Sequence, residues 1–259
     1  MRALRYTFLA LVLAIAWAVL VVVGTMHGWL RSPLAPRGDA AGFEHAAMQM
    51  IRGSNAGNAV LVLIEHGRAR PALTYSIGTP VASDTRFQMA SVSKWVTAWA
   101  VLHLAEQQRV DLDAPIDHYL KRWHLPKGAF PNEGATVRRV LSHSAGLGDG
   151  LGFLGYAPGT PVPNVVDELR FTRDRMPNRS GEVRVTRMPG DRMEYSGGGY
   201  LMLQLMIEDV TGEPFTQYMQ REVLAPLGMR DSTFDANTVP AAKLATFYDE
   251  QHHAATHYH

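Results

Sequence analysis

One stretch of the chain is apolar on nearly every side. Residues 91–106 carry valine, tryptophan, leucine and alanine around the whole circumference of a helix, with few polar interruptions. A surface helix shows an amphipathic pattern instead, so this stretch predicts a helix buried within a domain. The chain can form such a core, because 259 residues with 46% hydrophobic content suffice for one or two domains.

A serine and a lysine stand at the start of this stretch, in Ser91-Val92-Ser93-Lys94. Residues three apart lie on one helix face, so the Lys94 amine can reach the Ser91 hydroxyl. A lysine removed from water loses affinity for its proton, and helix N-terminal amides stabilise an oxyanion. The pattern predicts acyl transfer to Ser91. The structural alternative makes Ser91 a helix N-cap and Lys94 a solvated first-turn residue.

Four segments in a consistent order resemble the serine β-lactamase and penicillin-binding-protein superfamily, in particular its class C β-lactamase-like branch of esterases and D-amino-acid peptidases. Residues 140–147, VLSHSAGL, are similar to the family's LLxHTSGL signature. The other three segments are residues 87–94, residues 110–116, and residues 189–229, which include Tyr195-Ser196-Gly197. Together they indicate a resemblance over roughly residues 43–235 in the family's order, which is more specific than one motif.

The resemblance implies roles for individual residues. Ser91 is the nucleophile, and its backbone amide supplies one oxyanion donor. Lys94 accepts or relays the serine proton, and Tyr195 is the second base or the proton donor to the leaving group. Many relatives have Asn where this chain has Gly197, a substrate-binding position. That departure favours an esterase or D-amino-acid peptidase over a true β-lactamase, although the glycines also allow a tight loop.

The family's third motif, Lys or His followed by a small residue and Gly on a strand, is not found after Tyr195. The resemblance therefore implies a C-terminally truncated chain. The implied fold is α+β and β-lactamase/transpeptidase-like, with an antiparallel sheet flanked by helices and a mainly helical subdomain. The C-terminal sheet strands, and the second oxyanion donor, would belong to the absent portion.

Local patterns give the expected elements. They predict a helix over residues 43–51, a hairpin of strands 58–66 and 72–77 around Gly67, and a loop-rich, mainly helical region over 113–190. A helix is expected over 200–210, ending before Thr211-Gly212, and another near Pro214. The domain prediction is a membrane segment at 1–30, a linker at 31–42 and the hydrolase domain at 43–259.

The N-terminus predicts a membrane-targeting segment. Arg2 and Arg5 precede an uncharged apolar run over residues 6–23, which approaches the length of a bilayer span. A cleavable signal peptide usually ends in a small-x-small site, and residues 24–26 offer a poor one. We therefore expect an uncleaved single-pass anchor with the catalytic part outside the cytoplasm, in the periplasm; the alternative is secretion after cleavage.

Composition excludes other classes. The net charge is +1 without a basic block, which argues against a nucleic-acid partner. Absence of cysteine excludes disulfides and thiolate chemistry. We predict neither a metal nor another cofactor, because the histidines near the C-terminus, His252, His253, His257 and His259, stand at an end expected to fray.

Two further motifs suggest other kinds of site. Gly150, Gly152 and Gly155 form a G-x-G-x-x-G pattern, but no convincing strand precedes it and no helix follows, so a mobile loop is expected rather than a nucleotide site. His143 between Ser142 and Ser144 invites a Ser-His triad, yet no nucleophile elbow or acidic partner accompanies it. A hydrogen-bonded structural role in the turn is the expectation.

Three functions remain open at this stage. The first is a membrane-anchored serine hydrolase that cleaves a small ester, amide, peptide or β-lactam through an acyl-enzyme. The second is a penicillin-recognising receptor or peptidoglycan-binding module without efficient turnover, and the third is an inactive truncated fragment. The sequence gives neither the natural substrate nor the oligomeric state.

Overall fold

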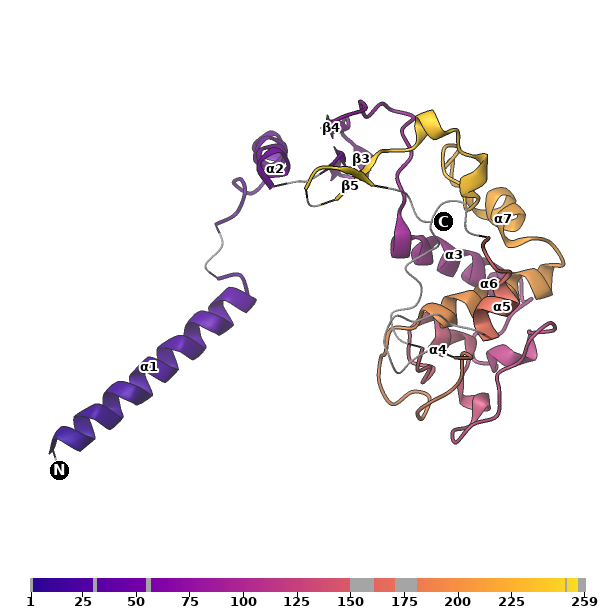
Figure 1. The fold of residues 1–259 in the computed structure, drawn as a ribbon, viewed down its shortest axis with the longest axis horizontal. Helices are drawn as coiled ribbons and strands as arrows, with labels where there is room; N and C mark the ends of the chain where they lie inside the picture. Colours follow the sequence, from indigo (N-terminus) through magenta and orange to yellow (C-terminus); the bar gives the residue numbers. More distant parts are fainter. Residues whose placement is uncertain are drawn as a thin grey trace. The chain divides into compact units, whose positions relative to one another are not determined.

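The computed structural model describes residues 2–29, 32–54, 57–149, 161–170, 181–249 and 251–255. The chain divides into two compact units, Met1–Pro80 and Val81–His259. Figure 1 shows the succession of helices and short strands along the chain. The glycine-rich pattern at Gly150, Gly152 and Gly155 lies outside the described residues, as do His257 and His259.

The first unit begins with α1 (Arg2–Met26), drawn in Figure 1 as one uninterrupted helix. Its segment Arg5–Met26 is long and apolar enough to cross a membrane. Its apolar side chains are largely exposed, for example Leu13 and Trp17 at 61% and 67%. The predicted apolar helix is therefore present, and it forms without packing on a protein core.

The rest of the first unit is a helix and a broken hairpin. Helix α2 is Ala40–Ser54, and the strands are β1 (Ala59–Leu61), β2 (Ile64–Glu65), β3 (Arg68–Ala69) and β4 (Leu73–Tyr75). Strand β1 pairs antiparallel with β4, and β2 with β3, around Gly67 at φ +74°. Arg70 joins helix and hairpin by donating two hydrogen bonds to Glu44, at 2.8 and 3.1 Å. The predicted hairpin is confirmed, with an interruption between its two paired parts.

The second unit is mainly helical. Its α-helices are α3 (Ser93–Glu106), α4 (Val137–Leu141), α5 (Val165–Arg170), α6 (Gly197–Thr211) and α7 (Phe215–Tyr218). A π-helix, η4 (Met219–Leu224), follows α7, and the short strands β5 (Phe247–Tyr248) and β6 (Ala254–Ala255) pair antiparallel. The remaining turns are 3-10 helices: η1 (Ala90–Val92), η2 (Ile116–His118), η3 (Asn132–Gly134), η5 (Ala236–Thr238) and η6 (Ala241–Lys243). The predicted α+β class is confirmed, with short antiparallel strand pairs.

The core of the second unit is built around α6. Both α4 and α5 pack on α6, as does α3. The fully buried residues of α6 include Met202, Leu203, Leu205, Met206 and Ile207. The helix ends as predicted, because Gly212 takes the left-handed conformation at φ +79° that closes a helix C-terminus.

Helix α3 differs from its prediction. Ala100, Val101 and Leu104 are buried, on the side where the helix contacts α6 and η4. Trp95 is 80% exposed and Trp99 55% exposed. The prediction of a helix buried on every side is therefore wrong: one face packs and the opposite apolar face lies open, because burial requires a partner element on each side.

Candidate active site

Ser91 lies in a tight turn directly before α3. The turn is the 3-10 helix η1, and α3 begins at Ser93, so Lys94 belongs to its first turn. A 3-10 helix has three residues per turn, which places residues three apart on the same side. The N-cap of α3 is Val92, with no side-chain cap. The capping role considered for Ser91 is therefore not what the structure shows.

Two polar groups contact the Ser91 hydroxyl. Lys94 Nζ lies 3.2 Å from Ser91 Oγ, and the Tyr195 hydroxyl lies 2.8 Å from the same oxygen. Tyr195 comes from the segment that precedes α6, 104 residues further along the chain. Ser91 is exposed, and Lys94 and Tyr195 are partly buried. The oxygen is thus open to solvent on one side and held by two proton-carrying groups on the other.

Lys94 also shapes the electrostatics of Tyr195. Its Nζ lies 5.1 Å from the centroid of the Tyr195 ring and 5.6 Å from that of Tyr200, within the range of cation–π contacts. Burial by itself raises the pKa of Tyr195, but hydrogen bonds from Lys94 and Ser91 and the lysine charge outweigh it. The net pKa of Tyr195 is lowered, which favours the phenolate beside Ser91.

The N-terminus of α6 is anchored by a buried carboxylate. Asp149 is 5% exposed and accepts hydrogen bonds from Ser196 Oγ at 2.5 Å and the Gly198 backbone N–H at 2.6 Å. Ser196 Oγ in turn caps the helix by accepting from the Gly199 N–H at 2.8 Å. A Cβ on Gly198 would lie 2.5 Å from Val183 Cγ2 and 2.9 Å from Asp149 Oδ2. The tight passage considered for this glycine run is therefore real at Gly198.

His143 lies beside the tyrosine. Its ring stacks on Tyr195 with centroids 4.5 Å apart, and its Nδ1 accepts the Ser196 backbone N–H at 3.1 Å. Ser142 Oγ and Ser144 Oγ contact each other at 2.9 Å. The two serine hydroxyls hydrogen-bond to each other, and His143 Nδ1 bonds to the backbone of Ser196. The geometry therefore does not support a Ser-His triad on His143.

Sequence reasoning missed Asp149. The sequence marks it only as an acidic residue in the glycine-rich stretch that follows the VLSHSAGL signature, and nothing nearby indicates its partners. A buried carboxylate at a helix N-terminus is favourable both as a hydrogen-bond acceptor and toward the helix dipole. Gly197, the predicted substrate-binding position, is the first residue of α6 and follows the Tyr195-Ser196 pair directly.

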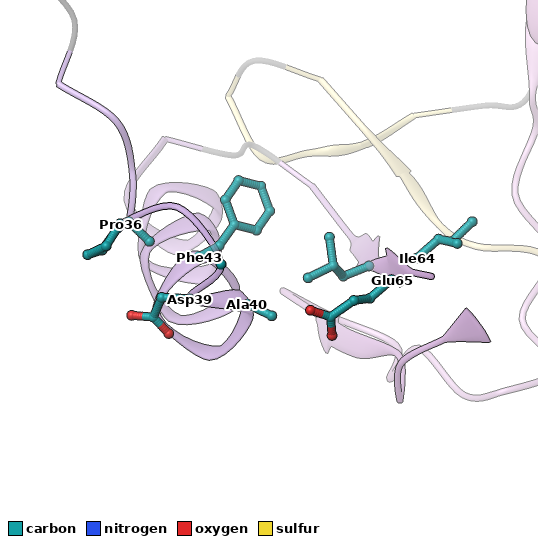
Figure 2. Close-up of a pocket in the computed structure, with 9 residues that line it drawn as sticks. Pro36, Asp39, Ala40, Phe43, Ile64 and Glu65 are labelled. Atoms are coloured by element: carbon teal, nitrogen blue, oxygen red, sulfur yellow. The ribbon is translucent and has the colours of Figure 1, made fainter. Parts of the chain in front are cut away.

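A surface pocket and a C-terminal histidine involve residues other than those of the Ser91 site. The first unit contains a pocket of about 310 Å³. Figure 2 shows part of its lining, with Asp39, Ala40 and Phe43 on the helix side and Ile64 and Glu65 on the strand side. Within the described part of the chain, no three histidine, aspartate or glutamate side chains gather as metal ligands would. His253 instead pairs with Asp249, Nδ1 to Oδ2, at 3.4 Å.

Comparison with known proteins identifies the family of the chain. The sequence profile of the Beta-lactamase family matches residues 47–257. Esterase EstB of Burkholderia gladioli is 29% identical over 214 residues, covering 78% of this chain and 53% of that protein. Penicillin-binding protein 4* of Bacillus subtilis is 28% identical over 153 residues, covering 59% and 31%.

A solved structure supports the same assignment. D-amino acid amidase from Ochrobactrum anthropi SV3, complexed with D-phenylalanine, superposes with a TM-score of 0.60 at 25% identity. The match covers 77% of this chain and 54% of the amidase. The fold and the sequence together define a β-lactamase/transpeptidase-like protein. The chain belongs to the Beta-lactamase family. It spans about half the length of the esterase and of the amidase, and 31% of penicillin-binding protein 4*.

Proposed function

We propose that the chain is a membrane-anchored serine hydrolase that cleaves an ester, amide or lactam through an acyl-enzyme on Ser91. The observation that carries this proposal is the meeting of Lys94 Nζ and the Tyr195 hydroxyl at Ser91 Oγ, at 3.2 and 2.8 Å. A serine becomes a nucleophile when a base accepts its proton within such distances. Family membership and similarity to an esterase and an amidase support the same chemistry.

Acylation follows from the geometry. The Ser91 proton passes to the Tyr195 phenolate, or to Lys94 in its neutral amine form, as Oγ attacks the substrate carbonyl carbon. The resulting oxyanion takes a hydrogen bond from the Ser91 backbone N–H. The bond from the carbonyl carbon to the leaving oxygen or nitrogen then breaks, and that atom receives the proton from Tyr195 or Lys94.

Deacylation uses the same groups in the same roles. A water molecule gives a proton to Tyr195 or Lys94 while its oxygen attacks the acyl carbon. The bond from that carbon to Ser91 Oγ breaks, and the proton returns to Oγ. The products are an acid and the alcohol or amine of the leaving group, so the reaction consumes one water and no other reagent.

The substrate class follows from Gly197. Glycine offers no side-chain amide to bind a substrate carbonyl at the start of α6. We therefore propose an ester or a D-amino-acid peptide or amide as the preferred small-molecule substrate, ahead of a β-lactam. Similarity to an esterase and to a D-amino acid amidase supports this order.

The experiment is covalent labelling of the full 259-residue chain with a fluorophosphonate and with a labelled penicillin. We expect Ser91 to be labelled, the penicillin adduct to turn over, and Ser91→Ala to abolish both. Ser93→Ala is the matched control, because Ser93 lies in the same segment and makes no contact with Lys94 Nζ or the Tyr195 hydroxyl among the described contacts. A stable penicillin adduct on a chain that hydrolyses neither an ester nor a D-amino-acid amide would instead identify a receptor, and no adduct an inactive fragment.

We further propose that α1 is an uncleaved anchor that keeps the catalytic part outside the cytoplasm, in the periplasm. Support comes from its apolar segment Arg5–Met26, mostly exposed on the protein, and from Arg2 and Arg5 at its start. The chain should stay with membranes after alkaline carbonate extraction and keep its N-terminal mass. A mature protein that begins beyond residue 26 would show signal cleavage and secretion instead.

A further inference from the structure

His143 contacts three consecutive residues, Glu194, Tyr195 and Ser196. Its backbone carbonyl accepts the Glu194 N–H at 2.7 Å, and its Nδ1 accepts the Ser196 N–H at 3.1 Å. Its ring stacks on that of Tyr195 at 4.5 Å and 29°. The two hydrogen bonds fix the backbone on both sides of Tyr195, and the ring contact limits the rotation of its side chain.

The ring itself is held by a second aromatic residue. Tyr200, one turn into α6, lies 5.2 Å from the His143 ring and donates its hydroxyl proton to the Leu141 carbonyl at 3.1 Å. His143 also takes the left-handed backbone conformation, at φ +56°, which a residue with a β-carbon adopts at a cost. Strained conformations of this kind persist where the surroundings fix them, often at functional sites.

The hydrogen bond to Ser196 requires one protonation state. A nitrogen that accepts a hydrogen bond carries no proton, so neutral His143 has its proton on Nε2. Protonation would place an N–H on Nδ1 against the Ser196 N–H and remove the bond. Burial, and then the charge of Lys94, lower the pKa of His143 and keep the ring neutral.

We propose that His143 is a positioning residue, which holds the Tyr195 hydroxyl against Ser91 while its ring is neutral and releases it when the ring is protonated. The effect on turnover rests on the proposed function of Ser91. The titratable groups that face the ring are Lys94 from α3, Tyr195 from the segment before α6 and Tyr200 from α6. Hydrolytic activity should therefore fall at acidic pH as His143 becomes protonated, and this acidic limb of the pH profile should depend on His143.

The test compares two substitutions of the same residue with p-nitrophenyl acetate as the substrate. His143→Ala removes the acceptor and the ring, and kcat should fall about 100-fold with little change in KM, because the tyrosine is displaced rather than the substrate. His143→Asn keeps an acceptor at the place of Nδ1 and tolerates positive φ. It should recover kcat to within about fivefold of the wild type and lose the acidic limb of the pH profile.

His66→Ala is the matched control, since His66 is also left-handed, at φ +51°, but is exposed in the first unit. It should leave kcat and the pH profile unchanged. An Asn variant that is folded yet as slow as the Ala variant overturns the proposal. So does an acidic limb that persists in His143→Asn, because it would then belong to Lys94 or Tyr195.

A measurement without substrate separates this proposal from the hydrolase assignment. In ¹⁵N NMR spectra, the imidazole signals of His143 are assigned as those that disappear in His143→Asn. At neutral pH they should show an unprotonated Nδ1 and a protonated Nε2. A proton on Nδ1 overturns the contact on which the proposal stands. If the NMR result holds while fluorophosphonate leaves Ser91 unlabelled, the hydrolase assignment fails and turnover control by His143 fails with it.

Discussion

Helices α3 and α6 are both rich in apolar residues, yet the structure treats them differently. Helix α6 is buried along its length, and its N-terminus is closed by Ser196 and Asp149. Helix α3 leaves Trp95 and Trp99 exposed and begins without a side-chain cap. The Ser91 site lies where these two N-terminal ends meet, so one end supplies a firmly held tyrosine and the other an accessible serine and lysine.

The largest effect should come from removing the α3 partner of Ser91. Lys94→Ala removes a hydrogen bond to Ser91 and also the charge that lowers the pKa of Tyr195. Tyr195→Phe removes only the tyrosine hydroxyl, which contacts Ser91 from the segment that precedes α6. We expect hydrolysis of p-nitrophenyl acetate to fall about 1,000-fold for the lysine variant and about 100-fold for the tyrosine variant. A greater loss for Tyr195→Phe would reverse the ranking of the two helix ends.

Two leucines test burial directly. Leu203 on α6 is fully buried and Leu102 on α3 is 50% exposed. Leu203→Ala should lower the free energy of unfolding by about 2–5 kcal/mol, because it leaves a cavity. Leu102→Ala should cost less than about 1 kcal/mol, since little apolar surface is lost from the core. Urea unfolding measures both, and equal losses would show that the open face of α3 is covered in solution.

The anchor of α6 gives a third comparison. Asp149→Ala leaves the buried Ser196 hydroxyl and Gly198 N–H without their acceptor. The free energy of unfolding should fall by about 2–3 kcal/mol, and kcat should fall because Tyr195 precedes the loosened helix end. The control is Asp113→Ala, which removes an exposed ion pair with Arg138 and should lower the free energy of unfolding far less than Asp149→Ala does. Unchanged stability of Asp149→Ala would contradict a firmly held α6 terminus.

The smallest effect concerns Ala90, the residue before Ser91 in the same 3-10 turn. Ala90 has φ +43°, a conformation that suits glycine, and is exposed. Ala90→Gly relieves this strain but gives the unfolded chain more freedom, so we expect a gain between about 0 and 1 kcal/mol. Ala98→Gly, inside α3, should instead cost about 1 kcal/mol. A thermal melt separates the two signs, and a clear loss at Ala90 would refute strain in this turn.

Local patterns predicted much of the framework of both units. The end of α6 at Gly212, the hairpin around Gly67 and the helix near Pro214 follow from short-range chemistry: left-handed glycine, alternation and a proline before the first turn. Asp149 escaped prediction because its partners, Ser196 and Gly198, are nearly fifty residues away. Hydrogen bonds between residues so far apart in the chain produce no recognisable spacing in a single sequence.

The sequence alone determined the family and the serine–lysine spacing, because a three-residue separation at a helix start places two side chains together whatever surrounds them. Only the tertiary structure decided that Tyr195 reaches Ser91, that His143 stacks on that tyrosine, and that α3 keeps an open apolar face. Those outcomes depend on which elements pack against one another, and packing is a property of the whole fold rather than of any one segment.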